Sequence, residues 1–193
     1  PPAGADATTR HNGNDLRFGG DGQDTISGEN ANDILNGNQG DDRLRGGPGT
    51  DYIRGGQNND QLFGDGGNDL LVGDLGTDSL TGGAGGDTFV LRTDRSELGE
   101  TIQGADQITD FNASEGDRIV LTGEFSTSAL SFQSIDVDGN GALDTVLSYA
   151  STRYSSSIES FVPVTLYFGT IMNQVIGATS PSILSLSAGD PLL

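Results

Sequence analysis

Single large apolar residues recur every nine positions along the first half of the chain. Each is the middle of a three-residue stretch whose outer members are mostly polar, as in Thr25-Ile26-Ser27 and Arg43-Leu44-Arg45. This period-two pattern predicts very short strands that each turn one side chain into a core and two side chains outward. The eight apolar residues are Ile26, Leu35, Leu44, Ile53, Leu62, Leu71, Leu80 and Phe89.

The apolar residue is the eighth position of a nine-residue unit, which repeats eight times without a gap between residues 19 and 90. Every unit has glycine at its first position and aspartate at its sixth. Glycine at the first position, and often at the second and fourth, permits the positive φ of a sharp turn. Each unit therefore predicts a six-residue turn followed by a three-residue strand. The sixth-position aspartates are Asp24, Asp33, Asp42, Asp51, Asp60, Asp69, Asp78 and Asp87.

A strand of this length cannot be stable alone, because it buries only one side chain. In a stack, two units form one coil of 18 residues, strands of successive coils pair in parallel, and the eighth-position side chains fill the space between two sheets. The expected fold is all-β, a right-handed parallel β-roll. We expect a linker or disordered start at residues 1–10, the roll at residues 11–91 and a β-rich cap at residues 92–193.

Turns on the same side of such a roll lie above one another, two units apart. Their carboxylates then stack at about 4.8 Å, the strand spacing of a sheet, which is costly without a cation between them. Carboxylate and carbonyl oxygens, without sulfur or imidazole, favour Ca²⁺ over zinc or copper, and magnesium resists losing its water shell. The expected neighbours are Asp24 and Asp42, Asp33 and Asp51, Asp42 and Asp60, Asp51 and Asp69, Asp60 and Asp78, and Asp69 and Asp87.

The sequence therefore predicts a row of calcium sites with about six to eight ions, held by aspartates and glycine carbonyls of the turns. An incomplete unit before residue 19 adds Asp15 opposite Asp33, but Arg17 stands where its apolar residue belongs, and we expect this unit to fray. Ala31 and Asn58 replace fourth-position glycines, and Ala31 tolerates positive φ poorly, so the sites beside them are the weakest. The expected ligands in the roll are Asp15, Gly20, Gly22, Asp24, Asp33, Gly40, Asp42, Gly47, Gly49, Asp51, Asp60, Gly67, Asp69, Gly76, Asp78, Gly83, Gly85 and Asp87.

The units resemble the nonapeptide G-G-x-G-x-D-x-U-x of RTX proteins, in which U is a large apolar residue. The fullest matches are residues 19–27, 46–54 and 82–90. The resemblance implies a parallel β-roll with Ca²⁺ in its turns. The alternative interpretation, a flexible polar linker rich in Gly, Asp and Asn, is expected to describe this part of the chain only in the absence of calcium.

Composition agrees with ion binding and disfavours several other functions. The chain has 28 acidic residues against nine basic ones, and seven calcium ions, with 14 positive charges, would change its formal net charge from −19 to −5. The negative charge disfavours nucleic acid and anionic membranes as partners. The absence of cysteine excludes disulfides and thiolate sites. No apolar run reaches membrane-spanning length, and residues 1–10 lack the apolar core of a signal peptide.

Beyond the repeats, residues 105–111 and 116–121 alternate like strands. The order Asp-Thr-Phe-Val, Asp-x-Ile-x-Asp-Phe and Asp-x-Ile-x-Leu resembles the segment that closes β-rolls in serralysin-type proteases and related secreted RTX proteins. The resemblance implies a cap over the last coil, which keeps an open sheet end from templating aggregation. The aspartates Asp106, Asp110 and Asp117 either bind a further ion or belong to turns and strand edges.

A second acidic loop, residues 136–144, has the D-x-D-x-N-G spacing of an EF-hand-like calcium loop. Leu147 stands where an EF-hand has its bidentate glutamate, and the flanks, residues 130–135 and 145–149, alternate like strands. This segment predicts a β-hairpin whose loop either binds Ca²⁺ or is a plain turn. Residues 162–171 are the most apolar stretch and predict a buried strand. The candidate ligands of the loop are Asp136, Asp138, Asn140 and Asp144.

Nothing in the sequence predicts an enzyme. The motifs H-E-x-x-H and G-x-S-x-G are absent, so the chain lacks the zinc motif of a metalloprotease and the nucleophile elbow of a lipase. The single histidine, His11, lies in the incomplete unit, where no pocket or triad can be argued. Met172 and the scattered serines form no catalytic pattern.

The predicted function is a calcium-dependent structural and secretion module. Calcium sites do not exist in the unfolded chain, so ion binding and folding are one event. Extracellular modules bind calcium with dissociation constants of order 10⁻⁴–10⁻³ M, so the chain should stay unfolded inside the cell and fold once it is secreted. The resemblance to secreted RTX proteins implies a type I exporter as partner and an export signal in residues 180–193.

Other functions remain open. The chain is alternatively an adhesive or surface-layer protein that self-associates or contacts a cell-surface partner. It is alternatively the C-terminal fragment of a secreted enzyme, of protease, lipase or epimerase type, whose catalytic domain precedes Pro1. A polysaccharide-binding module like those of alginate epimerases is disfavoured for a polyanionic sugar by the net charge of −19.

Overall fold

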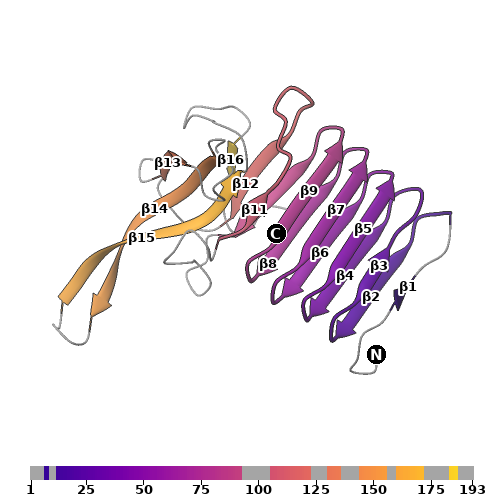
Figure 1. Cartoon of the computed structure of the whole chain (residues 1–193), viewed down its shortest axis with the longest axis horizontal. Helices are drawn as coiled ribbons and strands as arrows, with labels where there is room; N and C mark the ends of the chain where they lie inside the picture. Colours follow the sequence, from indigo (N-terminus) through magenta and orange to yellow (C-terminus); the bar gives the residue numbers. More distant parts are fainter. Residues whose placement is uncertain are drawn as a thin grey trace.

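This computed structural model describes residues 7–8, 12–92, 105–122, 130–135, 144–155, 160–171 and 183–186, with side chains in residues 12–91 and 105–122. The described residues form strands and turns without a helix, and their strands make two sheets (Figure 1). The larger sheet has the strand order β1-β3-β5-β7-β9-β11-β15-β14-β13, and the smaller has the order β16-β12-β10-β8-β6-β4-β2. A membrane-crossing helix is absent from this described part of the chain.

Successive strands of the roll alternate between the two sheets. The larger sheet holds β1 (Ala7–Thr8), β3 (Thr25–Ser27), β5 (Arg43–Pro48), β7 (Gln61–Gly66), β9 (Ser79–Ala84) and β11 (Gln107–Ile108). The smaller sheet holds β2 (Leu16–Asp21), β4 (Ile34–Gln39), β6 (Tyr52–Gln57), β8 (Leu70–Leu75), β10 (Thr88–Arg92) and β12 (Arg118–Thr122). The closing strands are β13 (Leu130–Ile135), β14 (Asp144–Ser155), β15 (Ser160–Ile171) and β16 (Ile183–Leu186).

Strand pairing confirms the predicted coil of two units and the all-β parallel roll. Ile26 of β3 lies opposite Leu44 of β5, and Leu35 of β4 lies opposite Ile53 of β6, both in parallel register. Equivalent residues of neighbouring coils are 18 positions apart, as in the hydrogen-bonded pair Asp24 and Asp42. Figure 1 shows the coils stacked as one row, from β2 and β3 near the N-terminus to β11 and β12 beside the closing strands.

Most strands are longer than the three residues predicted, so that prediction was wrong. β4 has six residues and continues through the first three positions of the next unit. Its register with β6 passes over the first-position glycine, because Asn36 pairs with Arg54 and Asn38 pairs with Gly56. Pairing persists there because successive coils have the same backbone shape, so the first half of each turn still meets its equivalent one coil away. Among the strands of the repeats, the three-residue strand β3 is the exception.

One column of apolar side chains forms the core, as predicted. The eight eighth-position residues are at most 1% exposed. Beyond the repeats the same column continues through Ile108 and Ile119, and Leu91, Phe111 and Leu121 join it. The rings of Phe89 and Phe111 lie with their centroids 6.3 Å apart, which anchors the closing segment to the last coil.

The sheets of the roll run on into the closing strands without a break. β11 pairs in parallel with β9 on one side and with β15 on the other, and β12 pairs with β10 and β16. β13, β14 and β15 are antiparallel, which confirms the predicted pairing across the 136–144 loop. The two strands predicted at residues 105–111 and 116–121 are the shorter β11 and β12.

Within the units, positive φ is confined to the second and fourth positions. Six residues other than glycine adopt it there, with φ between 72° and 81°. Ala31 has φ 81°, so this alanine adopts the positive φ that alanine tolerates poorly. Its Cβ costs about 1–2 kcal/mol in this left-handed region, whereas asparagine and aspartate fit it better. The other five residues are Glu29, Asn38, Asn58, Asp65 and Asp74.

We expect Ala31→Gly to stabilise the calcium-loaded roll by about 1 kcal/mol, because glycine relieves the strain at φ 81°. Ala84→Gly is the matched control. Ala84 is an exposed residue at the end of β9 without positive φ, and glycine there should leave stability unchanged or lower it by about 0.5–1 kcal/mol. Thermal unfolding at saturating calcium measures both variants, and an equal shift in the two would contradict the strain at Ala31.

Candidate metal centre

The fold gathers the sixth-position aspartates into two columns, one on each side of the roll. Each aspartate ends a turn and directly precedes a strand, so parallel pairing of the strands sets the aspartates above one another. Column one, on the turns that lead into the larger sheet, contains Asp24, Asp42, Asp60, Asp78 and Asp106. Column two, on the turns that lead into the smaller sheet, contains Asp15, Asp33, Asp51, Asp69, Asp87 and Asp117.

One hydrogen bond repeats along both columns. The backbone N–H of each aspartate donates to Oδ1 of the aspartate one coil further on, over 2.7–3.0 Å. All six aspartate pairs expected from the repeat spacing are brought together in this way, and Asp15 lies opposite Asp33 as expected. The side chains are buried: those of the eight complete units are at most 2% exposed.

The first-position glycines leave room for these carboxylates. A Cβ on Gly46 would lie 2.2 Å from Oδ2 of Asp51, and the other seven units show the same contact within 2.2–2.4 Å. None of these eight glycines, all within the described residues, has positive φ. The sequence explanation for the first position, a turn that needs positive φ, was therefore wrong. Glycine stands there because the aspartate side chain of the same unit fills the space that a side chain would need.

The second carboxylate oxygen of each aspartate in the complete units is buried. For seven of them, from Asp33 to Asp87, Oδ2 has no hydrogen-bond partner. Burial raises the pKa of Asp60 to about 8 and of Asp69 to about 7, with repulsion from neighbouring column aspartates as a further cause. The same burial raises the pKa of Asp42 and Asp51 to about 6. A cation beside these oxygens would stabilise the ionised form, so the columns fit a metal ion.

Backbone carbonyls of the stacked turns are a further source of oxygen donors. The fourth-position carbonyl oxygen of each turn points at the next turn, so a Cβ on Gly40 would lie 1.9 Å from the oxygen of Gly22, and one on Gly67 would lie 1.5 Å from that of Gly49. Among the described residues no three carboxylate or imidazole side chains form a ready metal cluster. An ion here would therefore combine column aspartates with carbonyls, a hard oxygen set that suits Ca²⁺.

The glycines predicted as carbonyl ligands all lie at second or fourth positions of these turns. Eight of these nine glycines have positive φ: seven lie between 99° and 134°, and Gly76 has 145°. Gly49 is the one predicted glycine without positive φ. Their role as ligands remains a prediction. The predicted glycines are Gly20, Gly22, Gly40, Gly47, Gly49, Gly67, Gly76, Gly83 and Gly85.

The start of column two has its own cation. Arg17 occupies the eighth position of the incomplete unit, its side chain is only 10% exposed, and its Nη2 donates to Oδ2 of Asp15 over 2.6 Å. The expectation that this unit frays was wrong, because β2 pairs with β4 along residues 16–21. Arg17 thus covers the end of the apolar column and neutralises the first carboxylate.

The sequence analysis missed a further set of side chains, at the fifth position of the units, that accept N–H groups of the neighbouring turn. Oδ1 of Asn32 accepts the N–H of Thr50, and Oδ1 of Asn68 accepts that of Gly86, both over 2.8 Å. On the other side Oδ1 of Asp41 accepts the N–H of Asn59 over 3.0 Å. The recurring Asn and Asp beside the sixth-position aspartate was the available signal, because short polar side chains commonly bond turn amides.

The acidic residues predicted beyond the repeats lie partly inside and partly outside the two columns. Asp106 and Asp117 continue the columns, and the signal was that each stands two residues before a buried isoleucine, as in the repeats. Asp110 lies outside the columns, and its carboxylate accepts the N–H groups of Gly82 and Gly83. Asp136, Asp138 and Asn140 lie outside the described residues, and only the backbone of Asp144 is described, at the start of β14, so that loop stays a prediction.

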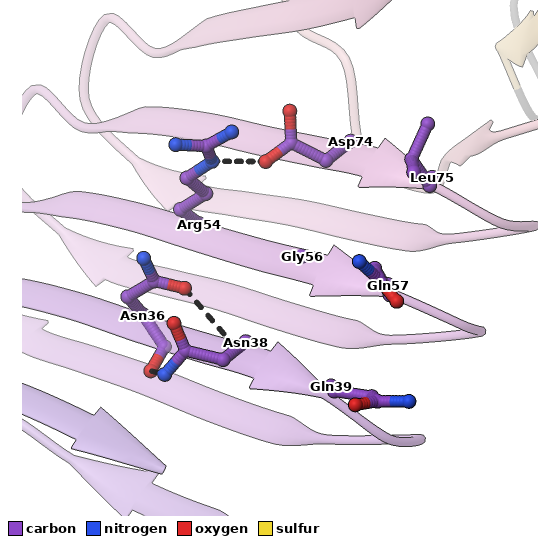
Figure 2. A pocket seen from close by; sticks show the side chains of 8 residues that line it. All are labelled: Asn36, Asn38, Gln39, Arg54, Gly56, Gln57, Asp74 and Leu75. Atoms are coloured by element: carbon purple, nitrogen blue, oxygen red, sulfur yellow. Dashed lines mark hydrogen bonds and ion pairs between the residues drawn. The ribbon is translucent and has the colours of Figure 1, made fainter. Parts of the chain in front are cut away.

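The outer face of the smaller sheet carries a polar groove of about 280 Å³ (Figure 2). Arg54 and Asp74 form an ion pair across adjacent strands at its upper end, and Arg45 and Asp65 pair in the same way on the larger sheet. Each arginine is at the ninth position of a unit, and each aspartate is at the second position of a unit, 20 residues further along the chain. These pairs neutralise two second-position aspartates that lie outside the columns.

Comparison with known proteins agrees with this geometry. Residues 11–44, 18–53, 36–71 and 54–89 match the RTX calcium-binding nonapeptide repeat. The roll of this chain is an RTX repeat region. No curated protein matches the chain.

Solved structures similar to this chain include two subunits of the mannuronan C5-epimerase from Azotobacter vinelandii. AlgE6R2 is 23% identical, with 90% of this chain and 92% of that chain covered and a TM-score of 0.46. AlgE6R3 is 24% identical, with 90% and 84% covered and a TM-score of 0.34. The extracellular lipase LipA from Serratia marcescens is 19% identical, with 91% and 40% covered and a TM-score of 0.32.

We expect Gly46→Ala to weaken calcium binding beside Asp51 by about tenfold, equivalent to about 1.4 kcal/mol, and so to raise the calcium concentration at the folding midpoint, because the new Cβ displaces the Asp51 carboxylate. Gly66→Ala is the matched control, since a Cβ on Gly66 meets nothing within 4 Å. A calcium titration followed by circular dichroism compares the two variants. Equal midpoints would show that the contact between glycine and carboxylate has no role in ion binding.

Without calcium, the roll should be more stable in acid than at neutral pH. Asp42, Asp69 and Asp60 have pKa values of about 6, 7 and 8 in the fold against 3.8 when unperturbed. The folded state therefore binds more protons, so this stabilisation is present below about pH 4 and is lost as the pH rises to about 8. Circular dichroism in chelator should show the sheet signal fall over this range, and Asp60→Asn should reduce the fall. A signal that increases with pH would contradict the raised pKa values.

Proposed function

We propose that this chain is an extracellular RTX module whose roll folds when Ca²⁺ binds between its stacked turns outside the cell. The observation that supports it most is the row of buried Oδ2 atoms without a hydrogen-bond partner, from Asp33 to Asp87. An ionised oxygen in such a place destabilises the fold strongly unless a cation compensates it. Calcium is the cation that suits carboxylates and carbonyls at turns without sulfur or imidazole.

Folding and ion binding form one equilibrium in this proposal. Within the repeats, neighbouring aspartates of a column are 18 residues apart and meet only when the coils stack. The sites are therefore absent from the unfolded chain, and calcium stabilises the folded state by its full binding free energy. The core gives little independent stability, since most units bury only one large side chain against the entropy of ordering nine residues.

The same equilibrium links the module to secretion. Extracellular calcium modules bind with dissociation constants of order 10⁻⁴–10⁻³ M, above the free calcium inside cells. The chain would then remain unfolded before export, pass a type I exporter, and fold from its C-terminal cap outside the cell. RTX repeats are typical of secreted proteins, which supports this location. We assign the export signal to residues 180–193 and a further calcium ion to the loop at residues 136–144.

The role that we assign to the roll is structural, not catalytic. The three invariant positions of the repeat each have a role in the fold: the first-position glycine makes room for the carboxylate, the sixth-position aspartate joins successive coils, and the eighth-position side chain fills the core.

Calcium titration of the purified chain tests the proposal. In chelator at neutral pH we expect a largely unfolded circular dichroism spectrum, and in millimolar calcium a cooperative change to β-sheet. Magnesium at the same concentration is the control and should be much less effective, since it dehydrates reluctantly. A β-rich spectrum that neither chelator nor calcium changes would refute calcium-coupled folding.

A further inference from the structure

The large hydrophobic side chains that are exposed among residues 12–91 and 105–122 all lie at one end of the roll. Leu16 and Phe18 of β2 are 62% and 52% exposed, and Ile34 of β4 is 47% exposed. β2 and β4 are the last two strands of the smaller sheet, at the end of the row of coils opposite the closing strands (Figure 1). Exposed apolar side chains that gather at one place, instead of being scattered singly, indicate an interaction surface.

The outer face of the smaller sheet is also apolar further along, but there its side chains are covered. The row of outward side chains that starts at Phe18 continues, after two polar residues, through Val72, Val90 and Val120. These three valines are at most 7% exposed and form a cluster. The apolar face is therefore covered toward the closing strands and exposed at β2 and β4, where the roll begins.

The larger sheet has a different outer face, whose side chains are mostly polar and pair with one another. Arg43 donates to Oε1 of Gln61 over 2.7 Å, and its guanidinium carbon lies 4.3 Å from the ring centroid of Phe63. The hydroxyls of Thr81 and Thr109 share a hydrogen bond of 2.8 Å. The apolar surface that calls for a partner is thus confined to the smaller sheet.

The backbone of β2 offers an open sheet edge beside these side chains. Among the described strands, β2 pairs only with β4, because β1 lies at the edge of the larger sheet and pairs with β3. The carbonyl oxygen of Asp15 accepts the N–H of Ile34 over 2.8 Å. Because hydrogen-bonding directions alternate along a strand, the N–H and C=O of Leu16 face away from β4. An edge of this kind is a template for pairing with another strand.

Charge permits two copies of this acidic chain to meet at this end. The formal net charge is −19, but Asp15, the first carboxylate of column two, is neutralised by Arg17 over 2.6 Å. An inward charge commonly keeps an edge strand from pairing, and here that charge is compensated within the same end of the chain. In antiparallel pairing centred on Leu16, Arg17 of one copy lies across from Asp15 of the other, so opposite charges face each other.

We propose that two copies of this chain associate end to end, with their β2 strands paired antiparallel about a two-fold axis at Leu16. The two smaller sheets then form one continuous sheet, and Leu16 and Phe18 of both copies gain strand neighbours on both sides. A second copy is the occupant because the end of the roll is the same kind of surface that each coil buries against the next, and a two-fold axis makes it self-complementary. The inference goes beyond the proposed function but requires the folded roll.

Sedimentation equilibrium of the full chain in saturating calcium, over a range of chain concentrations, should find a dimer. Phe18→Ser should raise its dissociation constant about tenfold or more, because the two-fold axis removes two apolar contacts at once. Phe63→Ser is the matched control. Phe63 is also a ninth-position phenylalanine, but it lies on β7 of the larger sheet, so its loss should leave the dissociation constant unchanged.

Leu16→Cys tests the register of the dimer. The chain has no cysteine, so a single thiol reports on one contact. Directly opposed residues of an antiparallel hydrogen-bonded pair have Cα atoms about 5.5 Å apart, within the range that a disulfide spans. Leu16→Cys should therefore form a disulfide-linked dimer under mild oxidation in calcium but not in chelator. Thr25→Cys, at the exposed start of β3 in the larger sheet, is the matched control and should form much less of it.

A wild-type chain that is rich in β-sheet in calcium yet monomeric at every concentration would overturn the proposal. Equal weakening by Phe18→Ser and Phe63→Ser would also overturn it, as would equal disulfide formation by the two cysteine variants. Circular dichroism of the same samples separates this failure from that of the proposed function. A chain that stays unfolded in calcium would contradict the proposed function as well as the dimer.

Discussion

The structure depends on carboxylates that are held inside the roll by their own backbone. From Asp33 to Asp87, each column aspartate accepts an N–H of the preceding coil at Oδ1 and keeps Oδ2 buried away from water. Removing an ionised carboxylate from water costs several kcal/mol unless charge compensates it. The repeat unit is organised around this constraint, since its first-position glycine leaves the space that the carboxylate fills and its fourth-position carbonyls point along the same axis.

The apolar column and the carboxylate columns stabilise different contacts in the roll. The eighth-position side chains hold the two sheets together, whereas the aspartates hold one coil to the next. Neither set exists locally, because both need residues from neighbouring coils. A solenoid of this kind gains stability through nearest-neighbour contacts, so its two ends require special residues. Arg17 serves one end, and Phe111, Asp110 and Asp117 serve the other.

Much of the roll follows from periodicity. A nine-residue interval with aspartate and a large apolar residue at fixed positions leaves few ways to bury the apolar residues, so coil length, core and aspartate pairs such as Asp33 and Asp51 were predictable. Three expectations failed for physical reasons that no single unit contains. Strands such as β4 are longer because neighbouring coils also pair along the turns. The first-position glycine is required because the aspartate side chain of the same unit occupies the space beside it. The unit that contains Arg17 is ordered because β2 pairs with β4.

The sequence by itself determined the period, the core residues and the ligand chemistry, because each of these is written in residue type and spacing. Only the tertiary structure decided what happens where the period ends. Asp106 and Asp117 join the columns although they stand 28 and 30 residues after their partners, because β11 and β12, which follow them, pair with the last strands of the repeats. Asp110, four residues from Asp106, instead bonds the amides of the last coil. Spacing alone does not separate these roles, because they depend on which backbone groups the final coil leaves unpaired.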